Sequence, residues 1–94
     1  MSRDIELLHV ITHPMRYAIV KILEKGRSYP SRIAKELGVD RKLVDFHLSI
    51  LRKYGLVHGE YGLENPPGSH RAYAVMYFEL TKEGRRILSL IKEV

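Results

Sequence analysis

The side chains best suited to chemistry in this 94-residue chain lie on one amphipathic segment, residues 40–54. At helical spacing its outer face carries basic, polar and aromatic residues: Arg41, Lys42, Asp45, Phe46, Ser49, Arg52 and Lys53. Cationic side chains neutralise phosphates, and side chains near the start of a helix can reach base edges in the major groove. We therefore expect this face to bind double-stranded DNA.

The individual positions on this face allow different roles. Arg41 and Lys42, at the start of the segment, are suited to contact bases or phosphates. Asp45 can accept a hydrogen bond from cytosine N4, or pair with Arg41 or Ser49, each about one helical turn away. Phe46 can contact a thymine methyl group or pack beneath a neighbouring hairpin. Two further cations, Arg52 and Lys53, lie near the end of the segment. They either contact DNA or are only solvated.

The inner side of the same segment predicts a buried helix face. Its apolar positions form two adjacent rows, Val44, Leu48 and Leu51 in one and Leu43, His47, Ile50 and Tyr54 in the other. Asp40 is suited to cap the start of the helix, and Gly55 is placed for a left-handed cap at its end. We expect His47 to be a packed core histidine rather than a ligand or a pH switch.

A shorter helix is predicted immediately before this segment. Residues 30–37 carry a narrow apolar stripe, and Gly38-Val39 then forms a turn before Asp40. A short helix, a glycine-containing turn and a longer second helix make a helix-turn-helix unit, here about residues 28–55. Ser31 and Arg32 in the first helix are further candidates for contact with DNA, although Arg32 can equally cap local carbonyl groups.

Composition supports a polyanionic partner. The chain has a formal net charge of +5 and a sequence pI near 9.6. Residues 27–53 hold seven Lys or Arg against three acids, a net of +4, and the remaining residues contribute only +1. Because the charge is concentrated in one motif, a merely solvated basic surface explains it less well.

The chain lacks the residues that several other classes of function require. There is no cysteine, so disulfides and thiolate sites are excluded, and the five histidines show no compact ligand spacing, so we expect no metal and no cofactor. No glycine-rich phosphate loop, carboxylate pair or nucleophile with an adjacent base predicts an enzyme. No apolar run approaches a membrane span, and no signal peptide opens the chain, so we expect a cytoplasmic protein. Scarce Asn and absent Gln suit a heat-adapted prokaryote, such as a thermophilic archaeon.

The hydrophobic period changes after Gly55. Residues 56–61 read as a short strand, residues 62–69 are rich in turn formers, and residues 71–80 alternate between two faces. Two strands directly after the second helix of the motif predict the wing of a winged helix, about residues 56–80. His70 and Arg71 in the wing either reach a minor groove or belong to a solvated hairpin.

Three more helices complete the prediction, at residues 3–12, 14–25 and 82–93. The first and the last are apolar over more than one stripe, so each is expected to be covered on two sides. The fold class is therefore α+β, mainly α: a winged helix-turn-helix with a three-helix core, a β-hairpin wing, and additional N- and C-terminal helices in one domain, residues 1–94.

Three segments carry a resemblance to a known family. Residues 13–23, HPMRYAIVKIL, resemble the HP-x-R-x-x-I-L-x-x-L opening of ArsR-type winged helix regulators. Residues 31–57 are similar to their L-A-x-x-L-G-x-S-x-x-T-V-S-x-H-L-x-x-L-x-x-x-G-L-V core, and residues 78–84 resemble their strand-to-helix junction. The resemblance covers about residues 13–88. Asp45 and Phe46 depart from the family pattern, which has Ser and a polar or basic residue there.

The resemblance implies a DNA-binding transcriptional regulator that is a homodimer joined through its first and last helices. Those are the two helices with surplus apolar surface, and the implied dimerisation residues are Ile5, Leu8, Ile11, Ile87, Leu90, Ile91 and Val94. Many family members sense metals through cysteines, or through Asp, His and Glu on the last helix; this chain has no cysteine, and residues 82–94 have no His or Asp.

The sequence therefore predicts a sequence-specific regulator that binds double-stranded DNA as a homodimer, with residues 40–54 in the major groove and half-sites about 10 base pairs apart. One alternative is a protein–protein interaction module that uses Tyr73, Val75 and Tyr77 as its contact surface. Another is an architectural DNA-binding protein with little sequence preference.

Overall fold

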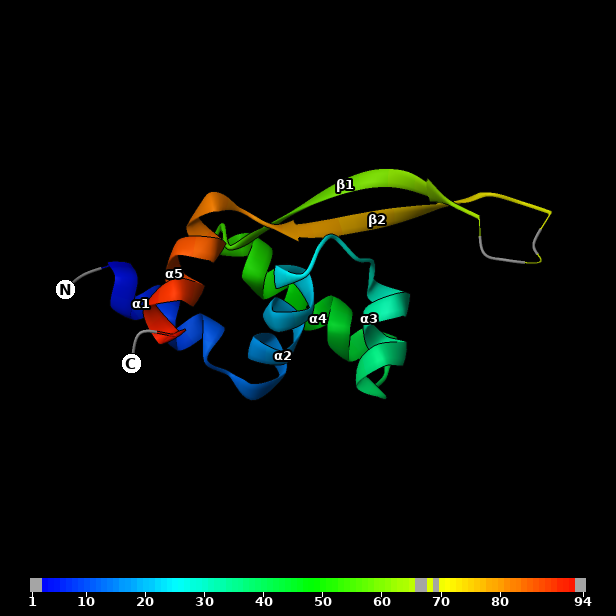
Figure 1. Ribbon diagram of the computed structural model, residues 1–94. Helices are drawn as coiled ribbons and strands as arrows, with labels where there is room; N and C mark the ends of the chain where they lie inside the picture. Colours follow the sequence, from blue (N-terminus) through cyan, green and yellow to red (C-terminus); the bar gives the residue numbers. More distant parts are fainter. Residues whose placement is uncertain (1–2, 66–67, 69, 93–94) are drawn as a thin grey trace.

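The computed structural model describes residues 3–65, 68 and 70–92, which form a bundle of helices with one long hairpin (Figure 1). The described elements are, in order, α1 (Arg3–Ile11), α2 (Pro14–Glu24), α3 (Pro30–Leu37), α4 (Arg41–Lys53), β1 (Val57–Glu64), β2 (Tyr73–Leu80) and α5 (Lys82–Lys92). The predicted mainly α, winged helix-turn-helix class is confirmed. Among the described residues, no helix combines the length and the apolar character that crossing a bilayer requires.

The helix boundaries follow local signals. Pro14 opens α2, where the side chain of His13 accepts a hydrogen bond from the Met15 amide at 3.1 Å. The Asp40 carboxylate caps α4 by accepting from the Lys42 amide at 2.8 Å. Gly38, between α3 and α4, has a φ of 68°, a left-handed conformation that side chains with a Cβ rarely adopt. The turn of the motif therefore depends on this glycine.

The core lies among all five described helices and the base of the hairpin, with Ile33 and Ala34 as the contribution of α3. Val44, Leu48 and Leu51 of α4 are fully or almost fully buried in it, as the first apolar row predicted. Leu43 is 39% exposed, so its place in a buried row was wrong. It precedes Val44 by about 100° around the helix, which turns its side chain away from the stripe that α2 covers.

The hairpin is longer than its sequence pattern indicated. β1 continues to Glu64 rather than ending at Tyr61, because β2 pairs with it in antiparallel register from Val57↔Leu80 to Glu64↔Tyr73. At its base, Ser28 exchanges two backbone hydrogen bonds with Phe78, of 3.1 and 2.7 Å. These bonds attach the segment before α3 to the sheet. Of the predicted tip, Pro66, Pro67 and Ser69 lie outside the described residues.

The two ends of the molecule carry different elements. The described residues extend over 52 × 24 × 21 Å, with the hairpin projecting beyond α3 and with α1 and α5 at the opposite end (Figure 1). An ion pair of 2.8 Å between Asp4 and Arg86 joins α1 to α5. The Arg86 guanidinium lowers the pKa of the Asp4 carboxyl below its usual value.

The structure separates the implied dimerisation residues into two groups. Ile11 and Ile87 are fully buried within the single chain, so assigning them to a dimer interface was wrong: the intramolecular core already covers them. Ile5 is 44% exposed, whereas Leu8, Leu90 and Ile91 are partly buried at the edge of the core. Val94 lies outside the described residues.

Candidate nucleic-acid interface

The outer face of α4 is open to solvent. All seven side chains that the sequence placed on it are exposed: Arg41, Lys42, Asp45, Phe46, Ser49, Arg52 and Lys53. The helix is held from behind by its buried row of Val44, Leu48 and Leu51. A rigidly packed helix can present its outer side chains to a groove without a change in the core.

Arg41 and Asp45 form an ion pair within this face. The Nε atom of Arg41 lies 3.6 Å from the Asp45 carboxylate, and both side chains are at least half exposed. The distance is long and solvent screens the pair, so it adds little stability. Of the two roles open to Asp45, this geometry favours pairing with Arg41 in the free protein, and it leaves the guanidinium accessible.

Phe46 is not covered by the hairpin. Its ring is 58% exposed and stands edge-on to the ring of His47, with 5.1 Å between the centroids. The hydroxyl of Ser49 donates to the Phe46 carbonyl at 2.6 Å. The structure thus does not support packing beneath the wing, and it leaves an aromatic side chain on the face that would meet DNA.

His47 occupies the inner side of α4, as predicted for a packed core histidine. It is 5% exposed, and its Nδ1 atom lies 3.2 Å from Nη1 of Arg16 on α2. The His13 ring lies 4.6 Å away, centroid to centroid. Burial, and then the charges of His13 and Arg16, lower the pKa of His47 below 6.5. No sequence pattern predicts this cluster, because its members are up to 34 positions apart.

Arg32 and Ser31, at the start of α3, differ in availability. The Nε atom of Arg32 donates to the Ser28 hydroxyl at 3.0 Å, and its Nη2 donates to the Arg27 carbonyl at 3.0 Å. Its guanidinium also lies over the Tyr29 ring, 4.6 Å from the centroid. Arg32 therefore has a local structural role, in agreement with the alternative that it caps a local carbonyl group. Ser31 is exposed.

The hairpin presents aromatic and apolar side chains rather than cations. Tyr61 is 76% exposed and Leu63 is 73% exposed, two positions apart on one face of β1. Sequence reasoning missed both, although their alternation within the strand was a usable signal. His70 and Arg71 are exposed in the segment that leads into β2, away from the buried base of the hairpin.

Tyr77 does not belong to an exposed surface with Tyr73 and Val75. It is only 8% exposed: its ring packs edge-on to Tyr29 at 5.6 Å, Arg27 lies over it at 4.1 Å, and its hydroxyl donates to Glu64. The proposed protein-contact surface on this strand was therefore wrong in one of its three members. Packing of the segment before α3 against the hairpin covers that face.

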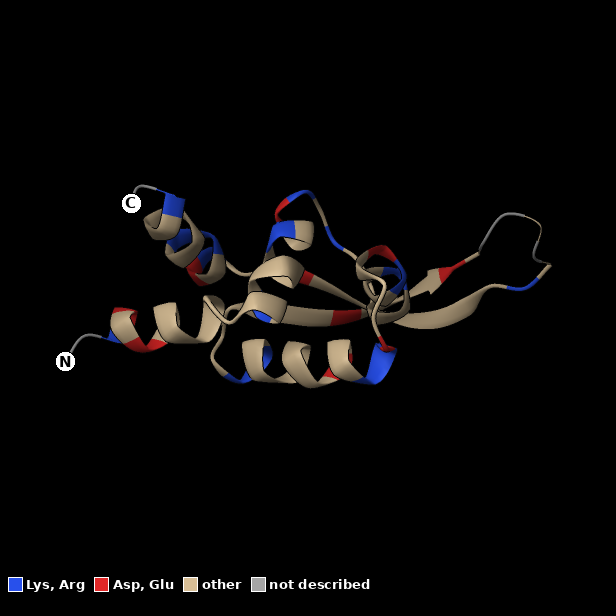
Figure 2. Cartoon of the chain, turned by 90° about the horizontal axis from the view of Figure 1, so that it is seen from below, with Lys and Arg blue, Asp and Glu red and all other residues tan. Residues whose placement is uncertain are grey.

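Charge is distributed over the whole molecule. Figure 2 shows basic positions interleaved with acidic ones along the helices, without one continuous basic stripe. Within α4, Arg41, Lys42, Arg52 and Lys53 outnumber the single acid, Asp45. α5 has a similar excess, but its Arg86 is paired with Asp4 and Glu83 and its Lys92 with Glu24. What distinguishes α4 is that its positive excess lies on an open face at the second helix of the motif.

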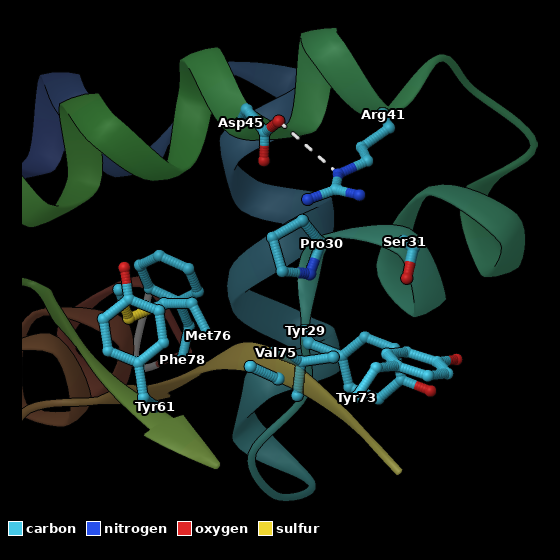
Figure 3. A pocket seen from close by; sticks show the side chains of 11 residues that line it. Tyr29, Pro30, Ser31, Arg41, Asp45, Tyr61, Tyr73, Val75, Met76 and Phe78 are labelled. Carbon is cyan, nitrogen blue, oxygen red and sulfur yellow. Dashed lines mark ion pairs between the residues drawn. The ribbon is translucent and has the colours of Figure 1, made fainter. Parts of the chain in front are cut away.

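A cavity of about 370 Å³ opens between the hairpin and the start of α3 and α4 (Figure 3). Tyr29, Tyr61 and Tyr73 contribute to its walls, and Arg41 and Asp45 lie at one side. These residues come from four separate elements or loops, so no sequence pattern could have brought them together.

Among the described residues, no group of three or more His, Asp or Glu converges as metal ligands.

Comparison with known proteins agrees with this geometry. Residues 13–58 match the family model described as bacterial regulatory protein, arsR family. The helix-turn-helix of this chain is of the ArsR type. The matched span contains α2, α3 and α4 and ends at the start of β1, so it includes the ArsR-type helix-turn-helix and its supporting helix. No curated protein is significantly similar to the chain in sequence.

Solved structures share the winged helix fold of this chain at low sequence identity. The transcriptional repressor BigR from Xylella fastidiosa superposes with a TM-score of 0.69 at 21% identity, over 93% of this chain and 78% of that one. A homodimeric winged helix-turn-helix DNA-binding domain from Mycobacterium bovis, a possible ArsR-family regulator, gives 0.72 at 17%, over 96% and 76%. HlyU from Vibrio vulnificus, a transcriptional regulator, gives 0.72 at 18%, over 97% and 85%.

Proposed function

We propose that this chain is a cytoplasmic transcriptional regulator that binds double-stranded DNA sequence-specifically as a homodimer, with α4 in the major groove. The exposed, locally basic outer face of α4 is the observation that carries the proposal. Its N-terminal side chains, Arg41 and Lys42, have the donors that read guanine or bind phosphates. The ArsR-type helix-turn-helix supports the same function.

The homodimer is proposed through α1 and α5. Ile5 is exposed on α1, and Leu8, Leu90 and Ile91 are partly buried at the edge of the core. α1 and α5, which carry these residues, lie at the end of the molecule opposite to the projecting hairpin (Figure 1). Apolar side chains in such a position are stabilised when a second copy covers them. A symmetric pair would present two α4 helices to two half-sites.

DNA binding is tested by fluorescence anisotropy with labelled duplexes. The protein is titrated into its own upstream region and into a shuffled duplex, at roughly 50 and 200 mM salt. We expect tighter binding to the upstream duplex and a loss of affinity at the higher salt, because phosphate contacts release counterions. Equal affinity for both duplexes would favour an architectural role, and no binding at either salt would favour a protein-interaction module.

The α4 assignment is tested with Arg41→Ala and Lys42→Ala in the same assay. Each should weaken binding by about 1–3 kcal/mol if it contacts a base, and by less for a phosphate alone. Lys82→Ala is the matched control, because it removes one exposed cation from α5 at the other end of the molecule. If the α4 variants bind as tightly as the control, α4 does not enter the groove.

The dimer is tested by sedimentation of the Ile5→Glu variant. Ile5 is exposed in the single chain, so a carboxylate there should leave the fold intact and oppose only association. We expect the wild-type protein to sediment as a dimer and the variant to be shifted toward monomer. A variant that remains as dimeric as the wild type would exclude α1 from the interface.

A further inference from the structure

The cavity between the hairpin and the helix-turn-helix has the size of a small-molecule site. Its volume of about 370 Å³ lies within the range of roughly 300–1,000 Å³ that ligand pockets occupy. β1 and β2 form one side, and the starts of α3 and α4 form the other. The site thus lies between two parts of the proposed DNA-binding surface.

The walls are suited to a flat aromatic body. Figure 3 shows Tyr61 beside Met76 and Phe78 on one side, and Tyr29 and Tyr73 together on the other. Tyr61 and Tyr73 are 76% and 46% exposed, so their rings have faces that the chain itself does not cover. Aromatic rings gain stability from offset or edge-to-face contact with another ring.

The remaining side of the cavity is suited to an anion. Arg41 and Pro30 both line this side, and the ion pair of Arg41 with Asp45 uses Nε at a long 3.6 Å (Figure 3). Its two terminal nitrogens are therefore available as the paired donors that match a carboxylate. The start of α3 also favours an anion. Its first-turn amides carry a partial positive charge, and Tyr29 provides no side-chain cap for them. The Ser31 hydroxyl also lines this side.

We infer that this cavity binds a small planar aromatic carboxylate, with its ring between the tyrosines and its carboxylate on Arg41. The inference deepens the proposed function and rests on it in one respect, since Arg41 is also assigned to DNA. A ligand carboxylate that occupies the Arg41 guanidinium withdraws it from the groove. Ligand and DNA then compete, and the ligand acts as an effector that releases the protein from its operator.

Ligand binding is tested on the DNA-free protein by ¹H–¹⁵N NMR, titrating 4-hydroxybenzoate and, separately, 4-hydroxybenzamide. The amide has the same ring without the charge. We expect saturable shifts at the amides of Ser31, Arg41, Tyr61 and Ala74 with the carboxylate, and binding at least about tenfold weaker with the neutral amide, because its bond to Arg41 is not charge-assisted. No saturable shifts, or equal affinity for the two compounds, would overturn the inference.

Ala74→Phe separates the ligand from DNA. Ala74 lines the cavity and carries no charge, so a larger side chain there should fill the site and leave the outer face of α4 unchanged. Ala72→Phe is the matched control: it adds the same side chain at an exposed position two residues away that does not line the cavity. We expect Ala74→Phe to abolish the ligand shifts and to retain DNA affinity, while Ala72→Phe retains both.

Competition is then measured by adding 4-hydroxybenzoate to the anisotropy assay. We expect it to lower the DNA affinity of the wild-type protein and of Ala72→Phe, but not that of Ala74→Phe. An equal effect on all three proteins would overturn the effector role. DNA binding without any ligand is read from the same titrations, so a protein that binds DNA but not the ligand contradicts only this inference. A protein that binds the ligand but no DNA contradicts the proposed function.

Discussion

Gly84→Ala should destabilise the protein, although alanine is normally the better helix former. Gly84 is buried in the first turn of α5, against the residue that leads into β1. A Cβ atom there would lie 2.1 Å from the carbonyl oxygen and 3.1 Å from the carbonyl carbon of Leu56. Non-bonded carbon atoms pack at about 3.5–4.0 Å. The obstacle is backbone, so α5 must move away by about 1 Å or more.

The expected change in the free energy of unfolding combines one stabilising and two destabilising contributions. Replacing glycine by alanine in a helix contributes about 0.8–1.0 kcal/mol of stability. Overpacking of a buried site costs about 1–3 kcal/mol. The displacement also strains the hydrogen bond from the Thr81 amide to the Leu56 carbonyl, 3.1 Å long and worth about 0.5–1.5 kcal/mol. We expect a net loss of about 1–3 kcal/mol, with a fall in Tm of roughly 4–8 °C per kcal/mol for a domain of this size.

The assay is urea unfolding followed by circular dichroism. Protein concentrations must be equal for all variants, because association would make the midpoint concentration-dependent. Ser89→Ala, an exposed substitution later in α5, is the control and should change stability by no more than about 0.5 kcal/mol. A Gly84→Ala protein as stable as the wild type, or more so, would refute the close approach of α5 to Leu56.

Two further predictions concern the inner side of α4. Leu48→Ala should lower the free energy of unfolding by about 2–5 kcal/mol in the same urea assay, because Leu48 is almost fully buried and its truncation leaves a cavity; a loss below about 1 kcal/mol would contradict its core position. Because the pKa of His47 is lowered in the folded protein, the free energy of unfolding should decrease as the pH is lowered. The folded protein binds the His47 proton less readily than the unfolded chain does, so stability is complete above about pH 6.5 and is lost below it, by at most about 1.4 kcal/mol per pH unit. Unfolding at pH 7.5 and 5.5 measures this loss, which should shrink in His47→Gln; an unchanged pH dependence would assign it to other groups. The Glu24 carboxyl, whose pKa its Lys92 and Lys21 partners lower to about 2, contributes in a separate window below pH 4.5.

Much of the fold was predictable because its boundary signals are local. The predicted helix at residues 30–37 is α3, and the segment 40–54 differs from α4 by one residue at each end. A proline or a cap at one end and a glycine at the other act within one turn of chain. The last helix also begins where predicted, since the Thr81 hydroxyl accepts from the Gly84 amide at 3.0 Å.

Burial of individual residues was less predictable. Leu43 and Ile11 have similar apolar character, yet one is exposed and the other fully buried. Periodicity reports how residues are spaced around one helix, but burial depends on which neighbouring helix covers that side. The length of β1 has a similar cause, because its last three residues are paired by β2 rather than specified by their own pattern.

The sequence by itself determined the order and type of the elements, the helix-turn-helix and the basic outer face of α4, because caps, turn residues and periodicity act over a few positions. Only the tertiary structure decided that Arg32 is engaged with Ser28 and Arg27, that Tyr77 is covered, and that a cavity forms beside Arg41. Those outcomes depend on segments that lie far apart in the chain, and contacts between such segments leave no spacing in the sequence from which they can be read.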